Sequence, residues 1–226
     1  MRNPWLDIPL ADYEGHMSLP GIAQAQMLAG ILADVVQQFR PPSLAVIGCS
    51  GGNGFDRISP AVTKRVVGVD LNPRYVEQAR ARHEGRFGSL ELHVADIRED
   101  SLDFPPVDLV FAALVLEYVP VDVFMAGIRP VLGPGGILAT VVQLPGASLA
   151  NVTPSAFASI RSLGSVMRLV PPAEVSRAAR LQGCIDAESR VASSAGGKQF
   201  QVQLFVAASA PRGTESAGPV RGSRPP

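Results

Sequence analysis

Short apolar runs alternate with segments of helical periodicity through the middle of the chain. The runs have the length of strands and lie at residues 43–47, 65–69, 90–94, 107–113 and 137–142. Helical patterns at 73–84 and 121–132 follow the second and fourth runs, and a proline suits the first turn of the earlier one. Strands that alternate with helices in this way predict a parallel, doubly wound α/β sheet, which binds ligands where its strands end.

The sequence on either side of this region follows other patterns. A helix is expected over 21–40, because two prolines follow it directly. The long connection 143–170 is typical of a lid or a substrate-binding insertion, with a short helix near 155–161. A helix from residue 172 to about 183 is then expected before two strand-like runs, 185–192 and 198–207, whose glycine-containing connection predicts a hairpin.

The charges of the chain balance. The 226 residues include 20 basic and 20 acidic side chains, so the formal net charge is zero. A dedicated nucleic-acid-binding protein usually has a basic excess, so we expect no nucleic-acid partner. With 46% hydrophobic residues, the chain has the material for a substantial core.

Cysteine, histidine and hydropathy patterns exclude several further classes. Two cysteines cannot build a disulfide framework, and three scattered histidines have no metal-ligand spacing, so no metal site is expected. The N-terminus lacks the apolar region of a signal peptide, and three carboxylates interrupt the most apolar stretch, 107–128. These patterns favour a soluble, cytoplasmic protein without a membrane span.

A glycine-rich loop directly follows the first apolar run. Residues 48–54 read GCSGGNG, and such a loop lets the backbone approach a ligand closely and offer its amides to an anionic group. The dinucleotide fingerprint G-x-G-x-x-G fails here, because Ser50 or Arg57 falls on a required glycine in the two possible registers. No Gly-Lys-Ser/Thr follows, so the loop is not a phosphate-binding P-loop either.

Two aspartates end the next two runs. Asp70 lies 22 residues after Gly48, a spacing at which a carboxylate can accept hydrogen bonds from ribose hydroxyls, although it could instead cap the following helix. Asp96 could accept from an adenine amino group while Ile97 packs on the ring. Its alternative is a solvated loop among the neighbouring charged residues.

These features together resemble the class I S-adenosylmethionine-dependent methyltransferases over residues 43–142. The glycine motif of that family typically reads V-L-D/E-L-G-C-G-x-G, and residues 44–52 read LAVIGCSGG. Two departures stand out, because Val46 replaces the usual acid and Ser50 replaces a glycine. The resemblance implies a Rossmann-like, mostly parallel seven-stranded sheet with an antiparallel C-terminal strand, and S-adenosyl-L-methionine as cofactor.

The resemblance also implies a division of the chain and a cofactor site. We expect an N-terminal flap and helix at 1–42, a methyltransferase domain at 43–208 and a disordered tail at 209–226. The flap places Tyr13 over the sulfonium, the glycines hold the methionine end, and the two aspartates hold ribose and adenine. The expected cofactor-binding residues are Tyr13, Gly48, Cys49, Gly52, Asp70, Leu71, Asp96 and Ile97.

A base is needed where the acceptor is a hydroxyl or a protonated amine. The candidates are Glu117 and Tyr118, after the fourth run, and His16 in the flap. Each has a plainer alternative, since Glu117 could face solvent, Tyr118 could only close the pocket and His16 could be structural. No Asn/Asp-Pro-Pro-Tyr/Phe motif follows the fourth run, so a small-molecule acceptor is favoured over an amide or a nucleobase.

Two other function classes stay open at this point. One is a catalytically silent S-adenosylmethionine-binding regulatory module, suggested by Val46 in the acidic position. The other is a nucleotide-dependent oxidoreductase on a related sheet, which the glycine spacing disfavours. The sequence does not indicate the acceptor or the oligomeric state.

Overall fold

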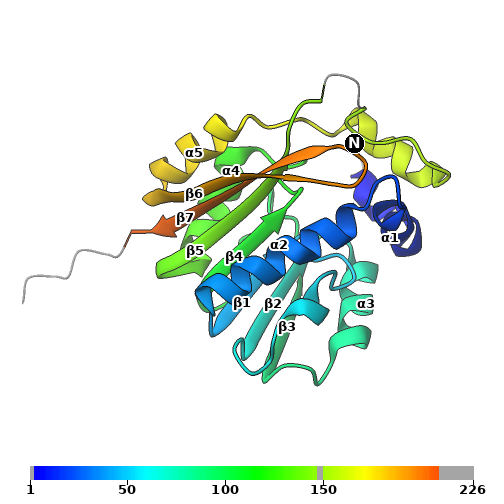
Figure 1. Ribbon diagram of the computed structural model, residues 1–226. Helices are drawn as coiled ribbons and strands as arrows, with labels where there is room; N and C mark the ends of the chain where they lie inside the picture. Colours follow the sequence, from blue (N-terminus) through cyan, green and yellow to red (C-terminus); the bar gives the residue numbers. More distant parts are fainter. Residues whose placement is uncertain (1–2, 147–149, 209–226) are drawn as a thin grey trace, which may run out of the picture.

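One seven-stranded sheet organises the molecule, with the strand order β3-β2-β1-β4-β5-β7-β6 (Figure 1). The computed structural model describes residues 3–146 and 150–208, so the predicted tail 209–226 lies outside the described residues. The strands are β1 (Ser43–Ile47), β2 (Arg65–Asp70), β3 (Ser89–Val94), β4 (Val107–Ala113), β5 (Leu132–Gln143), β6 (Cys184–Ser193) and β7 (Gln199–Ala207). The helices are α1 (Leu10–Ser18), α2 (Gln24–Phe39), α3 (Pro73–His83), α4 (Val121–Ile128) and α5 (Pro172–Leu181), with short 3₁₀ helices at Pro4–Leu6, Phe55–Arg57, Arg129–Val131 and Ala158–Ser165.

The pairing confirms the predicted fold class. Strands β1 to β5 are parallel where they pair, and β7 runs antiparallel between β5 and β6. In this register Ile47 faces Val69 on one side and Ala112 on the other. The carboxyl ends of β1, β2 and β4 therefore meet at one edge of the sheet, where such sheets bind ligands.

The start of β5 differs from the sequence-based expectation. A helix to residue 132 and a strand from residue 137 were predicted, but α4 ends at Ile128 and the strand begins at Leu132. Leu132 already pairs with Val107, and the register shifts before the next pair. A side chain at Gly133 would come within 3.3 Å of the Val107 carbonyl oxygen, so glycine lets the irregular pairing form.

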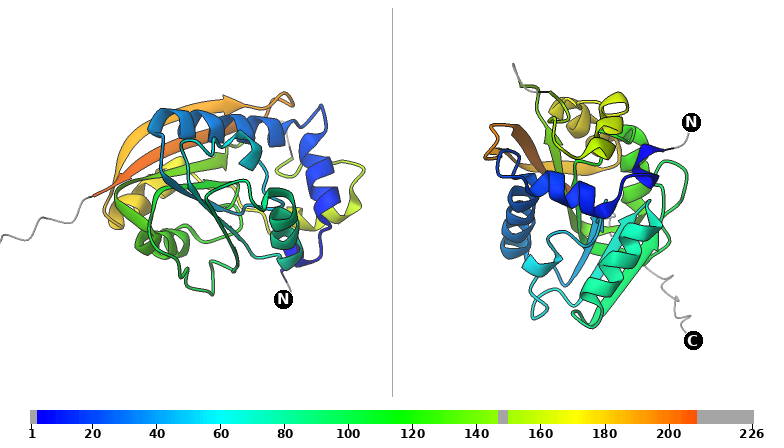
Figure 2. Two further views of the ribbon diagram at one scale, coloured as in Figure 1. Left: turned by 90° about the horizontal axis from the view of Figure 1, so that it is seen from below. Right: turned by 90° about the vertical axis from the view of Figure 1, so that its right-hand side faces the viewer.

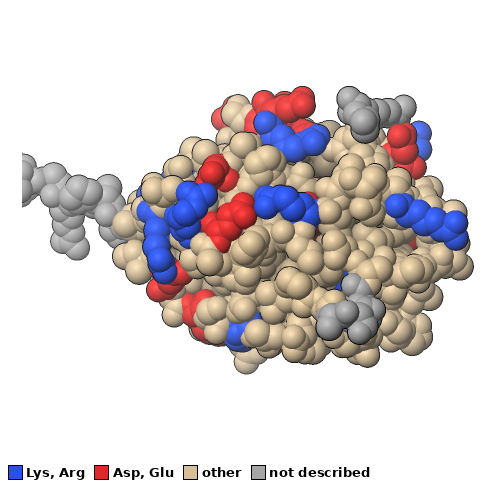
Figure 3. All heavy atoms as spheres, turned by 90° about the horizontal axis from the view of Figure 1, so that it is seen from above, with Lys and Arg blue, Asp and Glu red and all other residues tan. Residues whose placement is uncertain are grey.

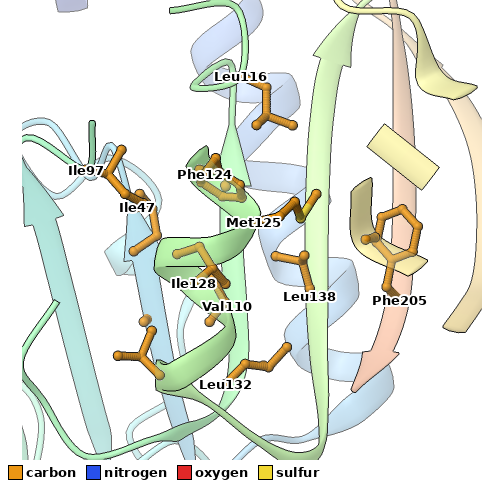
Figure 4. Packing of buried hydrophobic residues seen from close by; sticks show 14 of the residues in the cluster. Ile47, Ile97, Val110, Leu116, Phe124, Met125, Ile128, Leu132, Leu138 and Phe205 are labelled. Carbon is orange, nitrogen blue, oxygen red and sulfur yellow. The ribbon is translucent and has the colours of Figure 1, made fainter. Parts of the chain in front are cut away.

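Helices lie on both faces of the sheet (Figure 2), and they bury apolar residues against it. Helix α2 packs Ile31, Leu32 and Val35 against one face, and α4 and α5 cover the other face. Figure 4 shows Phe124 and Met125 of α4 among the strand residues of this second cluster. Phe124 is fully buried, and burying a side chain of this kind contributes about 1.5–3 kcal/mol.

Helix α1 was not predicted as a helix. It lies beside the 3₁₀ helix Ala158–Ser165, beyond the edge of the sheet (Figure 1). The Ser159 hydroxyl donates to the Asp12 carboxylate at 2.6 Å. Gly15 lets the α1 backbone approach the Phe157 ring closely, because a Cβ at residue 15 would lie 2.4 Å from that ring. We call this unit, α1 together with residues 155–165, the cap.

Charged side chains of both signs intermingle on the face drawn in Figure 3. Several ion pairs, such as Arg57–Asp56 and Arg177–Asp122, join exposed groups, and such pairs contribute little to stability. Among the described residues, no helix is long and apolar enough to cross a membrane.

Candidate functional site

A cavity of about 260 Å³ lies at the carboxyl edge of the parallel strands. Its floor consists of the residues that end or directly follow four strands, including Ile47, Asp70, Ala95 and Ala113. Its roof comes from residues of the N-terminal flap. The cavity therefore lies where the alternating pattern placed the ligand site.

The glycine loop has the close approach that its composition indicated. Gly48 has a φ of +70°, and a Cβ there would lie 2.7 Å from Val115 Cγ2, so the wall of the cavity leaves no room for a side chain. Ser50 is also in the left-handed region, with a φ of 52°. Its Oγ is buried and has no hydrogen-bond partner among the described residues. Since Ser50 lines the cavity, this hydroxyl is available to a bound polar group.

Two residues expected to bind the cofactor lie elsewhere. Cys49 is absent from the lining of this cavity, because its side chain is buried in the apolar core, and that burial raises the pKa of the thiol. Gly52 is also absent from the lining. A Cβ at Gly52 would lie 2.5 Å from the His83 ring, so this glycine makes room for a histidine of α3. The motif alone does not indicate which glycine faces the cavity.

Asp70 lines the cavity and fastens the loop beneath it. Its Oδ2 accepts from the Ser50 backbone N–H at 2.8 Å, and its Oδ1 accepts from the Asn72 N–H at 2.9 Å. Burial raises the pKa of Asp70 to about 6, and the backbone hydrogen bonds oppose that rise. The Asn72 side chain caps α3 by accepting from the Arg74 N–H, so Asp70 is not the helix cap, and Leu71 lines the cavity next to it.

Asp96 and Ile97 line the cavity on its β3 side. The Arg98 guanidinium binds both carboxylate oxygens of Asp96, and this bond lowers the pKa of Asp96. Each carboxylate oxygen has more than one lone pair, so Asp96 retains acceptor capacity toward the cavity. Ile97 is buried beside it. The structure thus brings both residues into the wall, and adds Arg98 as a positioning partner.

Four aromatic side chains form one wall of the cavity: Trp5, Tyr13, Tyr75 and Tyr118. The rings of Trp5 and Tyr118 meet edge to face at 5.0 Å, and Tyr13 stacks on Tyr75 at 6.3 Å. Burial raises the pKa of all three tyrosines, so their hydroxyls remain protonated at neutral pH. Sequence reasoning found Tyr13 and Tyr118 but missed Trp5 and Tyr75, whose partners come from distant segments.

The flap is attached to the rest of the molecule by polar contacts. The Trp5 carbonyl accepts from the Asn72 side chain at 2.9 Å, and the Tyr75 hydroxyl donates to the Ile8 carbonyl at 2.9 Å. Glu14 of α1 forms a bidentate ion pair with Arg82 of α3. Bidentate Arg–carboxylate pairs are among the stronger side-chain contacts, so the pair orients the cap over the glycine loop.

A smaller cavity of about 50 Å³ adjoins the first. The two share Trp5, Tyr13, Tyr118 and Leu114. Leu114 has a φ of 57°, a strained conformation for leucine that is typical of functional sites.

His16 lines this smaller cavity, and its Nδ1 lies 2.9 Å from the Ser155 hydroxyl. Burial, together with the charge of Lys198, lowers the pKa of His16, so its imidazole is neutral near pH 7. Lys198, which the sequence did not single out, lines the same cavity.

Glu117 is buried, but it lines neither the larger nor the smaller cavity. Its Oε1 accepts from the Gln143 backbone N–H at 2.7 Å, and burial raises its pKa to about 7. The alternative that Glu117 faces solvent is therefore wrong, because the side chain is 1% exposed. Its position gives no support to a role as base, since it is absent from the lining of both cavities.

Among the described residues, no group of three His, Cys, Asp or Glu side chains is arranged to hold a metal ion.

Comparisons by sequence find a family match and a curated relative. Residues 45–140 match the family model described as a methyltransferase domain. Over 118 residues the chain is 30% identical to an uncharacterized 37.1 kDa protein in transposon TN4556 of Streptomyces fradiae, and this match covers 50% of the chain. The chain spans about a third of the length of this curated relative, of which 34% is covered.

Solved methyltransferases have a similar fold. The N-methyltransferase NodS from Bradyrhizobium japonicum WM9, in complex with S-adenosyl-L-homocysteine, is 19% identical with a TM-score of 0.57, and 89% of each chain is covered. Magnesium protoporphyrin IX methyltransferase from Synechocystis PCC 6803, with bound S-adenosylhomocysteine, is 14% identical with a TM-score of 0.61, covering 81% of this chain and 83% of that one.

Geranyl diphosphate C-methyltransferase from Streptomyces coelicolor A3(2) is 15% identical with a TM-score of 0.59, covering 78% of this chain and 77% of that one. The family match of 45–140 and the shared sheet agree with the resemblance that the motifs indicated. Residues 45–140 are therefore similar to a methyltransferase domain, and the fold of the chain is that of solved methyltransferases.

Proposed function

We propose that the protein is an S-adenosylmethionine-dependent methyltransferase that acts on a small-molecule acceptor. The observation that carries the proposal is the 260 Å³ cavity, which combines a bare glycine turn, two carboxylates and an aromatic wall. The sequence match to a methyltransferase domain supports the same reaction.

The residues of the cavity fit the cofactor in three places. The bare backbone at Gly48 and the unpartnered Ser50 hydroxyl suit the polar methionine end. Asp70, at the end of β2, suits the ribose hydroxyls, since its anchored carboxylate oxygens keep further lone pairs. Asp96 suits the adenine amino group, with Ile97 beside it for the ring.

When bound, S-adenosylmethionine supplies a methyl group on a positively charged sulfonium. Tyr13 and Trp5 offer ring faces and edges in the wall between the two cavities, and an aromatic face attracts a cation by about 0.5–2 kcal/mol. The tyrosine hydroxyls stay protonated, so they add no competing charge. Holding the acceptor against this wall is the main catalytic task, since positioning alone can supply roughly 7–11 kcal/mol.

The smaller cavity is our candidate for the acceptor site, because it shares the aromatic wall with the larger one. We assign proton removal to His16, whose lowered pKa leaves it neutral and able to accept a proton near pH 7. Tyr118 is assigned to positioning, since its raised pKa opposes a role as base. Two structurally similar methyltransferases have names that indicate small-molecule acceptors, geranyl diphosphate and magnesium protoporphyrin IX. These names support a small acceptor for this chain as well.

Turnover assays test the proposal. The protein is incubated with S-adenosylmethionine and a panel of small acids, phenols and amines, and release of S-adenosylhomocysteine is measured. We expect acceptor-dependent release that His16→Asn lowers at least tenfold. Binding of the cofactor without turnover on any acceptor would instead favour the silent regulatory module.

A further inference from the structure

The smaller cavity is electropositive. Its lining includes the side chains of Lys198 and His16, and no aspartate or glutamate belongs to it among the described residues. The remaining polar side chains are uncharged, and they belong to Trp5, Tyr13, Gln24, Tyr118, Gln143, Asn151 and Thr153. A small ligand that enters this space meets basic nitrogen atoms and no carboxylate.

Lys198 is the unusual member of this set. Its side chain belongs to a residue that is 5% exposed, and its Nζ donates to Gln143 Oε1 at 3.2 Å and to the Asn151 backbone carbonyl. Both acceptors are neutral, and no ion pair of Lys198 occurs among the described residues. Burial without a counter-ion lowers the pKa of Lys198 to about 8.

A buried ammonium without a paired anion is costly, which is why lysines are rarely buried alone. The nearest candidate for a counter-ion along this hydrogen-bond network is Glu117. It binds the backbone N–H of Gln143 and lies outside the cavity. An ammonium has three N–H donors, and the two named acceptors leave one donor unused. A ligand carboxylate would supply both the missing charge and the missing acceptor.

We propose that the methyl acceptor carries a carboxylate, which Lys198 binds in the smaller cavity. This inference rests on the proposed function, because it places the acceptor beside the cofactor cavity. The shared residues Trp5, Tyr13 and Tyr118 then contact the part of the acceptor that receives the methyl group. His16 lies in the same cavity as Lys198, so an acceptor held by its carboxylate comes within reach of the base.

Calorimetry with matched probes tests the proposal. Benzoate and benzamide have nearly the same shape and differ in charge, so we titrate each into the protein loaded with S-adenosylhomocysteine, and also into the free protein. We expect benzoate to bind at least tenfold more tightly than benzamide. Lys198→Met is expected to abolish that preference, and Lys198→Arg to restore part of it.

Lys64 provides the matched control, because the chain has only two lysines and Lys64 is exposed. Lys64→Met should bind benzoate as the wild type does. If Lys198→Met does not fold, reductive ¹³C-methylation of the wild type gives separate NMR signals for the two lysines, and benzoate should move the titration of Lys198 alone to higher pH.

Equal binding of benzoate and benzamide, unchanged binding by Lys198→Met, or no binding of benzoate, phenylacetate or acetate would overturn the proposal. Tighter binding of phenyl phosphate than of benzoate would overturn the choice of a carboxylate. Binding of S-adenosylhomocysteine is measured first. Absence of this binding would count against the proposed function. The benzoate titration of the free protein would still test the role of Lys198.

Discussion

The carboxylate of Asp70 accepts a hydrogen bond from the Ser50 backbone N–H at 2.8 Å, which ties the end of β2 to the glycine loop after β1. One side chain thereby shapes the loop and faces the cavity. The contact also holds Ser50 in a left-handed conformation, with a φ of 52°. Loop geometry and ligand binding are therefore coupled at these two residues.

Substitutions at Ser50 separate backbone strain from hydrogen bonding. Ser50→Gly removes the positive-φ penalty, so we expect it to raise the free energy of unfolding by about 1 kcal/mol relative to Ser50→Ala. Both variants lose the buried hydroxyl, so both should bind S-adenosylhomocysteine more weakly by about 0.5–1.5 kcal/mol. Urea denaturation and calorimetry measure the two effects. Wild-type affinity in both variants would remove the hydroxyl from the site.

Tyr13 provides a test of the aromatic wall. Tyr13→Leu should weaken binding of S-adenosylmethionine by about 0.5–2 kcal/mol more than binding of S-adenosylhomocysteine, because only the former carries a positive charge. Tyr13→Phe keeps the ring and serves as the control, with both affinities close to wild type. The affinities are measured by calorimetry. An equal loss for both ligands in Tyr13→Leu would show that the ring contributes packing alone.

Glu117 is expected to make stability depend on pH. Its pKa is raised to about 7 from an ordinary 4.5, so between these values the folded protein holds the proton more tightly than the unfolded chain. The free energy of unfolding therefore falls as pH rises through this interval. Glu117→Gln keeps an acceptor for the Gln143 N–H and removes the titration, so it should reduce the fall by roughly 1–3 kcal/mol.

Chemical denaturation at pH 4.5, 6 and 7.5 measures this effect. Glu84→Gln, at an exposed carboxyl after α3, should leave the pH dependence unchanged. Asp70 also has a raised pKa, so part of the fall should persist in Glu117→Gln. An unchanged slope in Glu117→Gln would mean that folding does not raise the pKa of this carboxyl.

Local sequence patterns were sufficient to predict the sheet. Strands β1 and β4 have the predicted bounds, because an apolar run between turn residues specifies a strand covered on both faces. The strand β5 was predicted to begin at residue 137 and begins at Leu132, because the glycine-rich residues 133–136 form an irregular part of the strand. Helix α1 was missed because its contacts with Phe157 and Ser159 come from far along the chain.

The candidate site could be predicted only where a residue follows a strand. Asp70, Asp96 and Gly48 line the cavity because the topology brings strand ends together, as expected. Cys49 and Gly52 belong to the same motif, but their orientation depends on packing against the core and His83. Trp5 and Lys198 carry no motif at all, so only the folded chain shows that they meet the site.

Binding of S-adenosylhomocysteine to the wild type and to Asp70→Ala is the most direct measurement of the cofactor site. By calorimetry at pH 7.5 we expect one bound molecule per chain, and an affinity weakened by about 1–3 kcal/mol in the variant, as for a lost hydrogen bond to a charged group. Asp56→Ala, at an exposed carboxylate outside the cavity, should bind as the wild type does. Equal affinities in wild type and Asp70→Ala, or no binding by the wild type, would contradict an adenosyl cofactor in this cavity.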